Sequence, residues 1–133
     1  HGCLEQVASA TGIARTARRM LAADSRPSSL RSLKNISAKN VLDAAKAGDE
    51  LALDSLNKSC YYLGLVLATL SMVLDPQAYI IGGGVSKAGT FLTDMIKKYH
   101  DELSPMATKK ADIVLAKLGN DAGIYGAAKL ILG

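Results

Sequence analysis

The sequence predicts an α/β fold in which helices pack on a small parallel sheet. Segments with helical periodicity alternate with two short apolar runs, at residues 78–81 and 113–116, and a helical segment joins the two runs, as in parallel sheets. The first run is followed at once by three glycines and then by this helical segment. Hydrophobic residues make up 49% of the 133 residues, which is enough to build one packed core.

The first element predicted is a helix over residues 4–23, where apolar residues recur at helical spacing. Ser9 and Gly12 lie in its middle and are residue types that break or restart a helix. Residues 24–37 are rich in serine and contain one proline, so we expect a surface connection there.

The central part of the chain predicts a short helix and then a long one. Ser37 is a good N-cap for a helix over residues 38–47, which the following glycine ends. Asp49 caps the longest helix, over residues 50–74, and Pro76 prevents its continuation. The apolar residues of the long helix alternate in steps of three and four, so we expect one continuous buried face, packed against the sheet and the last helix. These residues are Leu53, Leu56, Cys60, Leu63, Leu67, Leu70 and Leu74.

The C-terminal part predicts two strands, at the two apolar runs, and two helices. The first helix covers residues 88–102, with Phe91, Met95 and Tyr99 on one side. His100 lies late in this helix beside lysines and an aspartate, and we expect it to be exposed. The last helix covers residues 122–132, with Asp121 as its cap and glycines that allow close packing.

The strongest local signal for chemistry is the glycine loop after the first strand, Gly82-Gly83-Gly84-Val85-Ser86. Glycines after a strand let the backbone approach a ligand closely, and the next helix start offers free N–H groups to an anion or polar ring. The spacing is neither that of a P-loop nor that of a dinucleotide fingerprint. From the pattern alone, a ligand-binding loop and a tight turn that needs positive φ angles both remain open.

Other candidate residues are less informative by themselves. A lone cysteine such as Cys3 is more often a small buried side chain than a metal ligand, and Glu5 is typical of a charge at a helix start. Arg15, Arg18 and Arg19 cluster without an aromatic platform, which favours a solvated face over a nucleic-acid site. The net charge of +4 suits phosphate-bearing ligands but is too small for a nucleic-acid signature.

The sequence carries no targeting segment. Its longest apolar run, residues 60–74, is shorter than the roughly 20 residues of a membrane-spanning helix and contains Ser71. Cys3 and Cys60 do not suggest a disulfide framework, so a reducing cytoplasm is expected. The chain opens at His1 without an initiator methionine, and we expect it to be part of a longer protein.

Three stretches, residues 1–12, 80–89 and 118–128, together resemble the ROK family of bacterial sugar kinases, especially its glucokinase branch. Their order and spacing cover essentially the whole chain, and residues 62–76 match the long helix between them. The stretches are residues 1–12, similar to the end of the Cys-x-Cys-Gly-x-x-Gly-Cys-x-Glu zinc signature, residues 80–89, similar to the nucleotide-binding glycine loop, and residues 118–128, similar to the closing helix motif.

The resemblance implies a fold, a set of ligands and a role for several residues. It implies that residues 1–133 are the C-terminal lobe fragment of an actin-like ATPase, a ribonuclease H-like fold. Cys3 then falls on the last zinc ligand of the signature, and Glu5 falls on the glutamate that binds sugar hydroxyls. The glycine loop, Gly82, Gly83, Gly84 and Val85, falls on the segment that packs against the adenosine part of ATP.

The implied activity is phosphorylation of glucose to glucose 6-phosphate by the longer protein, with ATP and Mg²⁺. The family's general-base aspartate, its phosphate-binding turn and its other zinc ligands precede the stretch covered here. No catalytic residue is therefore assigned to this chain, and we expect the isolated chain to be inactive.

Alternatives within the same family remain open. They are a kinase for another hexose or N-acetylhexosamine, and a sugar-responsive transcriptional repressor, which would carry a helix-turn-helix at its N-terminus. A third alternative is a packing or dimerisation unit without a function of its own. We expect a cytoplasmic homo-oligomer, such as a dimer, with glucose and ATP as partners and no nucleic acid or membrane.

Overall fold

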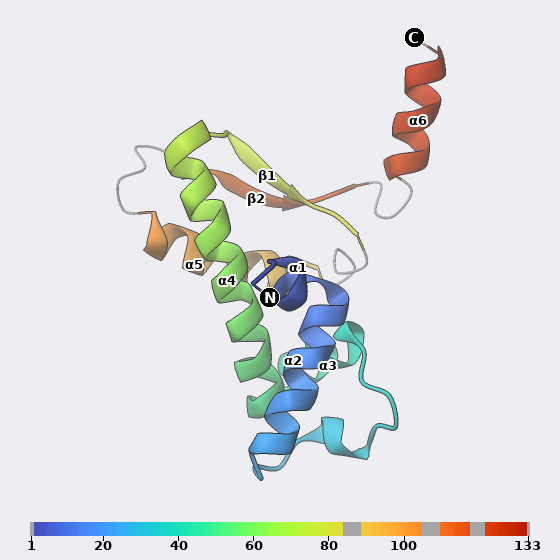
Figure 1. Ribbon diagram of the computed structural model, residues 1–133, viewed down its shortest axis with the longest axis vertical. Helices are drawn as coiled ribbons and strands as arrows, with labels where there is room; N and C mark the ends of the chain where they lie inside the picture. Colours follow the sequence, from blue (N-terminus) through green and yellow to red (C-terminus); the bar gives the residue numbers. More distant parts are fainter. Residues whose placement is uncertain (1, 84–88, 105–109, 118–121, 133) are drawn as a thin grey trace.

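The computed structural model describes residues 2–83, 89–104, 110–117 and 122–132, which form helices and one two-stranded sheet (Figure 1). The predicted α/β class is therefore confirmed. The elements are α1 (Glu5–Ala8), α2 (Ala10–Ala23), the 3-10 helix η1 (Ser29–Ser32), α3 (Ala38–Lys46), α4 (Glu50–Leu74), β1 (Ala78–Ile81), α5 (Thr90–Leu103), β2 (Asp112–Leu115) and α6 (Ala122–Leu132).

The N-terminal helical run is divided at Ser9, which ends α1 and begins α2. Its backbone is extended, and its hydroxyl accepts a hydrogen bond from the backbone N–H of Gly12 at 3.0 Å. Gly12 itself lies inside α2, where a Cβ atom would fall 2.8 Å from the carbonyl oxygen of Gln6. The break is thus made by the serine, whereas the glycine allows α1 and α2 to pack closely.

The helix caps expected at Ser37 and Asp49 are present. Ser37 forms a capping box with Asn40 at the start of α3, and Asp49 accepts the backbone N–H of Ala52 at the start of α4. At its other end α4 stops at Leu74, because Asp75 takes a left-handed conformation with φ of 44° before the proline.

The core lies around α4, which is packed by α2, α3 and α5 (Figure 1). The predicted buried face is correct for Leu56, Cys60 and Leu67, but it is wrong at the C-terminal end, where Leu70 and Leu74 are 39% and 67% exposed. There the buried side of the helix passes through Ala68 and Ser71 instead. A polar residue in an apolar helix marks the buried side at this end.

The sheet is parallel, with Ala78 opposite Asp112 and Ile81 opposite Leu115. Tyr79 and Ile81 point towards the core, whereas Ile80 is 71% exposed on the other face. The second strand begins one residue earlier than predicted. Among the helices described, α5 packs on the inner side of the sheet (Figure 1).

The last helix, α6, has the predicted bounds but not the expected packing. In Figure 1 it stands apart from α4 and the sheet, and its Ile124, Tyr125 and Leu130 are 71%, 61% and 88% exposed. The expectation that α6 would cover the long helix is therefore wrong for this chain. Its predicted cap, Asp121, lies outside the described residues.

None of the helices in the described part of the chain combines the length and the apolar character needed to cross a membrane.

Candidate functional site

The first part of the candidate site is the start of the glycine loop, at the carboxyl end of β1. Here the backbone N–H of Ala116 donates to the carbonyl oxygen of Ile81 at 2.8 Å, so pairing with the second strand continues to the last residue of β1. Gly82 and Gly83 follow directly and are exposed. Gly84 and Val85, which the sequence also assigned to this loop, lie outside the described residues.

The two described glycines meet different requirements. Gly83 has φ of +81°, a conformation that favours glycine over any other residue. Gly82 has no positive φ, and a Cβ atom built on it would lie 3.6 Å from the Cβ of Ala116, which is ordinary van der Waals contact. The turn therefore requires glycine at position 83, whereas the described neighbours of Gly82 leave room for a side chain.

The second part of the candidate site is the N-terminal turn that carries Cys3 and Glu5. Both residues are exposed, and the backbone N–H of Gln6 donates to the carbonyl oxygen of Cys3 at 3.0 Å. Glu5 is the acidic residue in the first turn of α1, and the N-cap of this helix, Leu4, makes no side-chain cap hydrogen bond. Its carboxylate can accept hydrogen bonds from a ligand's hydroxyl groups.

The structure brings these two segments to one part of the core. Ala8, at the end of α1, and Ile81, at the end of β1, line the same small apolar cavity of about 20 Å³ with Cys60 and Leu63 of α4. Glu5 lies three residues before Ala8, and Gly82 follows Ile81. The cavity is too small for a ligand, so its significance is that α1 and the end of β1 are held against the same helix.

Within the described residues, no three His, Cys, Asp or Glu side chains are grouped as metal ligands. Cys3 is a free, exposed thiol, and a structural zinc ion takes four N or S ligands. The described part of the chain therefore does not fit a zinc ion by itself. Cys60 is buried, and burial raises the pKa of its thiol to about 12.

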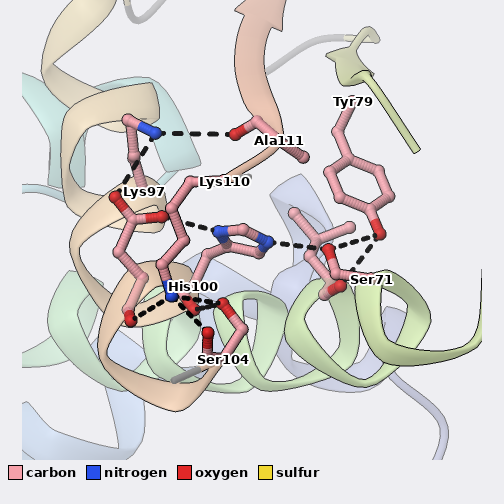
Figure 2. Close-up of polar contacts among 9 residues, drawn as sticks. Ser71, Tyr79, Lys97, His100, Ser104, Lys110 and Ala111 are labelled. Carbon is pink, nitrogen blue, oxygen red and sulfur yellow. Dashed lines mark hydrogen bonds and ion pairs between the residues drawn. The ribbon is translucent and has the colours of Figure 1, made fainter. Parts of the chain in front are cut away.

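A polar network that the sequence analysis missed lies beneath β1 (Figure 2). His100, expected to be exposed, is fully buried, and its Nε2 lies 2.8 Å from the hydroxyl oxygen of Ser71. That hydroxyl lies 3.1 Å from the hydroxyl of Tyr79, which donates to the carbonyl oxygen of Leu67 at 2.9 Å. The expectation that His100 is exposed was wrong because it was based on the charged residues beside it in the sequence. The spacing of Leu92, Ile96 and His100, four residues apart, places the histidine on the buried stripe.

The outer side of the network is charged. Asp101 accepts from His100 Nδ1 at 2.9 Å and pairs with Lys97 Nζ at 3.3 Å. Partial burial works to raise the pKa of Asp101, but the hydrogen bonds from His100 and Lys97 outweigh it and hold the pKa below its usual value. Lys110 donates to the carbonyl oxygens of Asp101 and Ser104, close to the end of α5 (Figure 2).

Arg15 and Arg18, two of the arginines clustered in the sequence, bind backbone carbonyl groups of the same chain. Arg18 donates to the carbonyl oxygen of Ile36 at 2.8 Å, and Arg15 donates to that of Gln6. Arg31 donates to the carbonyl oxygen of Leu21 at 3.0 Å, near the C-terminal end of α2. These bonds fasten α2 to the segments before and after it.

The sequence matches the ROK family over residues 1–133. A glucokinase of Halalkalibacterium halodurans is 41% identical, and the match covers 98% of this chain and 41% of that protein. Among solved structures, a ROK family glucokinase from Streptomyces griseus in complex with glucose and AMPPNP is 32% identical with a TM-score of 0.83, over 98% of this chain and 44% of that one. This chain therefore spans less than half the length of these relatives.

Relatives with other functions also match. An N-acetylmannosamine kinase of Escherichia coli is 31% identical, over 99% of this chain and 40% of that protein. The structure of a ROK family transcriptional regulator is 30% identical with a TM-score of 0.77, over 96% of this chain and 32% of that one.

Proposed function

This chain belongs to the ROK family, and we propose that the full-length protein is a glucokinase, which transfers the γ-phosphoryl group of ATP to the 6-hydroxyl of glucose. The observation that carries the proposal is the 41% identity to a glucokinase over 98% of the chain. The fold agrees with this, because the chain has the fold of part of the actin-like ROK sugar kinases that it resembles. In this proposal residues 1–133 are the C-terminal lobe segment.

The nucleotide contact in this proposal is the glycine loop, Gly82 to Val85. The free space beside Gly82 supports it, because the described fold does not explain why that position lacks a side chain. A glycine at the end of a strand allows the adenosine part of ATP to approach the backbone closely. Mg²⁺ would accompany the phosphates and neutralise the charge that develops on them.

The sugar contact in this proposal is Glu5. Its carboxylate is exposed at the first turn of α1, and a charged acceptor forms stronger hydrogen bonds with hydroxyl groups than a neutral one. Glu5 binds and orients the sugar and takes no proton. The general base that removes the proton of the 6-hydroxyl is assigned to the remainder of the full-length protein.

In this proposal Cys3 is the one zinc ligand assigned to this chain. Since the described residues do not form a zinc site by themselves, the other ligands would come from the remainder of the full-length protein. The ion has a structural role, and no step of phosphoryl transfer depends on it.

The proposal is tested by steady-state kinetics of the full-length protein with ATP, Mg²⁺ and several sugars. We expect kcat/KM for glucose to exceed that for N-acetylmannosamine by at least about tenfold, which is a difference of about 1.4 kcal/mol in transition-state binding. The isolated 133-residue chain in the same coupled assay is expected to produce no glucose 6-phosphate above the blank.

Two other outcomes would replace the proposal. A higher kcat/KM for N-acetylmannosamine would assign the protein to the class of the Escherichia coli relative. Absence of turnover with any sugar, together with sugar-dependent binding to DNA, would assign it to the class of the regulator. The first outcome keeps the nucleotide site and changes the sugar, whereas the second keeps sugar binding and removes phosphoryl transfer.

The role of Glu5 is tested in the same assay with Glu5→Gln. Hydrogen bonds to a charged group are worth about 1.5–3 kcal/mol, so the KM for glucose should rise by about an order of magnitude or more, with the KM for ATP unchanged. Glu50→Gln is the matched control, because Glu50 is also an exposed glutamate in the first turn of a helix. Equal kinetics of the two variants would assign Glu5 to the helix start only.

A further inference from the structure

His100 is a buried residue that the proposed function does not use. It lies where α4, α5 and β1 meet, with no exposed surface, and both ring nitrogens are within hydrogen-bond distance of an oxygen. A buried polar ring is costly unless its hydrogen bonds are made, so the residue needs an explanation. Its bond to Ser71 connects α5 to α4, and Ser71 in turn contacts Tyr79 of β1 (Figure 2).

The connection to β1 runs through two hydroxyl groups. His100 meets Ser71 of α4, Ser71 meets Tyr79 of β1, and the Tyr79 hydroxyl also donates to the carbonyl oxygen of Leu67. The rings of Tyr79 and His100 also pack edge to face, with centroids 6.0 Å apart. Tyr79 lies three residues before Gly82, so this network holds the strand that carries the glycine loop.

Counting protons fixes the direction of each bond. The only hydrogen of the Tyr79 hydroxyl is donated to Leu67, so Tyr79 can only accept from Ser71. Ser71 then has no hydrogen left for His100, and the ring Nε2 must donate to it. A neutral imidazole carries a hydrogen on only one of its two nitrogens. Either the contact to Ser71 or the contact to Asp101 would then lack a proton. The network is complete only when His100 carries a hydrogen on both nitrogens.

The charged groups around the ring favour the form of His100 that has a hydrogen on both nitrogens. Asp101 supplies a carboxylate to Nδ1, and the C-terminal end of α5 favours a cation in its last turn. Lys97 and Lys110 are the nearby cations that would disfavour a charged ring. Lys97 pairs with the second carboxylate oxygen of Asp101, and Lys110 donates to backbone carbonyl groups near the end of α5. From α4 and β1 the groups that face the ring are uncharged, namely the hydroxyls of Ser71 and Tyr79.

We propose that His100 is a positioning residue of the nucleotide site, whose imidazolium form completes the hydrogen-bond chain that fixes Tyr79 and the end of β1 beneath Gly82. The inference rests on the proposed nucleotide role of the glycine loop. Loss of a proton from His100 breaks one link of the chain. The strand then loses its tie to α5, and the loop is held less firmly for ATP.

The first experiment measures KM for ATP and for glucose in the full-length protein carrying Tyr79→Phe. This change removes the link to β1 and leaves His100, Ser71 and Asp101 in place. One neutral hydrogen bond corresponds to a factor of about three to ten, so KM for ATP should rise by that factor while KM for glucose stays within about twofold. Tyr99→Phe is the matched control, because the Tyr99 hydroxyl donates to Asn57 of α4 and not to a group on β1.

The pH profile separates positioning from simple support of the fold. In the unmodified protein, KM for ATP should depend on pH, because the hydrogen-bond chain is complete only when both ring nitrogens of His100 carry a hydrogen. Tyr79→Phe should have a flatter profile, since its strand is no longer tied to the ring. Titration of ATP itself is common to both proteins and cancels in their ratio. Equal rises of both KM values, or parallel pH profiles, would overturn the inference.

A second measurement does not depend on activity. Nitrogen-15 NMR of the full-length protein at about pH 6, with His100→Gln to assign the signals, reports whether each ring nitrogen carries a proton. We expect both to be protonated in the unmodified protein and one tautomer to gain population in Tyr79→Phe, where Ser71 is free to donate. A neutral ring in the unmodified protein would overturn the inference. Failure to use ATP at all would instead overturn the proposed function.

Discussion

Gly64 of α4 and Tyr99 of α5 are in direct contact where the two helices cross. A Cβ atom on Gly64 would lie 2.6 Å from the Cβ of Tyr99 and 3.0 Å from the backbone nitrogen of His100. The absence of a side chain at position 64 therefore lets α5 approach α4 closely enough for His100 to reach Ser71. The glycine and the buried histidine are parts of one packing arrangement.

The first prediction is that Gly64→Ala destabilises the protein. Alanine favours a helix by about 1 kcal/mol over glycine, but the new methyl group cannot fit without moving the backbone of α5. Overpacking typically costs about 1–3 kcal/mol, so we expect a net fall in the free energy of unfolding, measured by urea titration. Gly82→Ala is the control, because a Cβ there has ordinary contact distances. Increased stability of Gly64→Ala would show that the two helices can separate without cost.

The second prediction uses Gly82→Ala as a probe of nucleotide binding. Since the described fold has room for this methyl group, stability should stay within about 0.5 kcal/mol of the unmodified protein. If ATP packs against the backbone here, the methyl group should raise KM for ATP several-fold and leave KM for glucose unchanged. Gly83→Ala is less informative, because φ of +81° makes any side chain at that position strained. Unchanged kinetics of Gly82→Ala would mean that the loop does not contact the nucleotide.

Most of the fold could be predicted because local signals and tertiary packing agree. Ser37 and Asp49 begin helices through hydrogen bonds within a few residues, and Pro76 prevents continuation because it has no backbone N–H. Such local features can be read from the sequence. The order of strand, glycine loop and helix was predicted for the same reason. Position on a helix surface was harder, because it depends on which neighbours cover each face.

The errors occurred where tertiary contacts decide. Leu70 and Leu74 continue the apolar period of α4, but the described residues cover that side incompletely, so both are exposed. His100 has charged neighbours in the sequence but is buried, because Gly64 brings α5 close to α4. For the candidate site, the sequence predicted Cys3, Glu5 and the glycine loop, whose roles remain predictions, but not the network beneath Tyr79.

The third prediction concerns the two cysteines. Cys60 is buried and its pKa is raised to about 12, so it should not react with iodoacetamide at about pH 8 in the native protein. Cys3 is exposed in this chain and should react. If Cys3 is a zinc ligand in the full-length protein, it should be protected there until a chelator is added. Mass spectrometry of the labelled peptides distinguishes the two sites, and Cys60 provides the internal control. Rapid labelling of Cys3 before chelation would exclude it as a ligand.

The fourth prediction concerns Asp49, whose carboxylate joins the start of α4 to the 3-10 helix η1. One oxygen accepts the backbone N–H of Ala52 at 3.1 Å, and the other accepts the hydroxyl of Ser28 at 2.9 Å and both the N–H and the hydroxyl of Ser29 at 2.7 Å. Partial burial works to raise the pKa of Asp49, but these hydrogen bonds outweigh it and hold the pKa below its usual value of 3.8.

A carboxyl group with a lowered folded-state pKa contributes stability above its unfolded pKa and loses that contribution as the pH falls through the folded value. Asp49→Asn keeps one oxygen for the cap but replaces the acceptor of the Ser28 and Ser29 bonds by a donor. We expect a loss of about 1–2 kcal/mol at neutral pH, measured as the free energy of unfolding in urea. This loss should shrink as the pH falls below about 4, because the unfolded chain takes up the proton of Asp49 there, whereas the folded protein takes it up only at lower pH. Asp43→Asn, a change at an exposed carboxylate of α3, should cost little at any pH. A difference between Asp49→Asn and the unmodified protein that stays constant down to about pH 2 would show that the charge of Asp49 does not stabilise this junction.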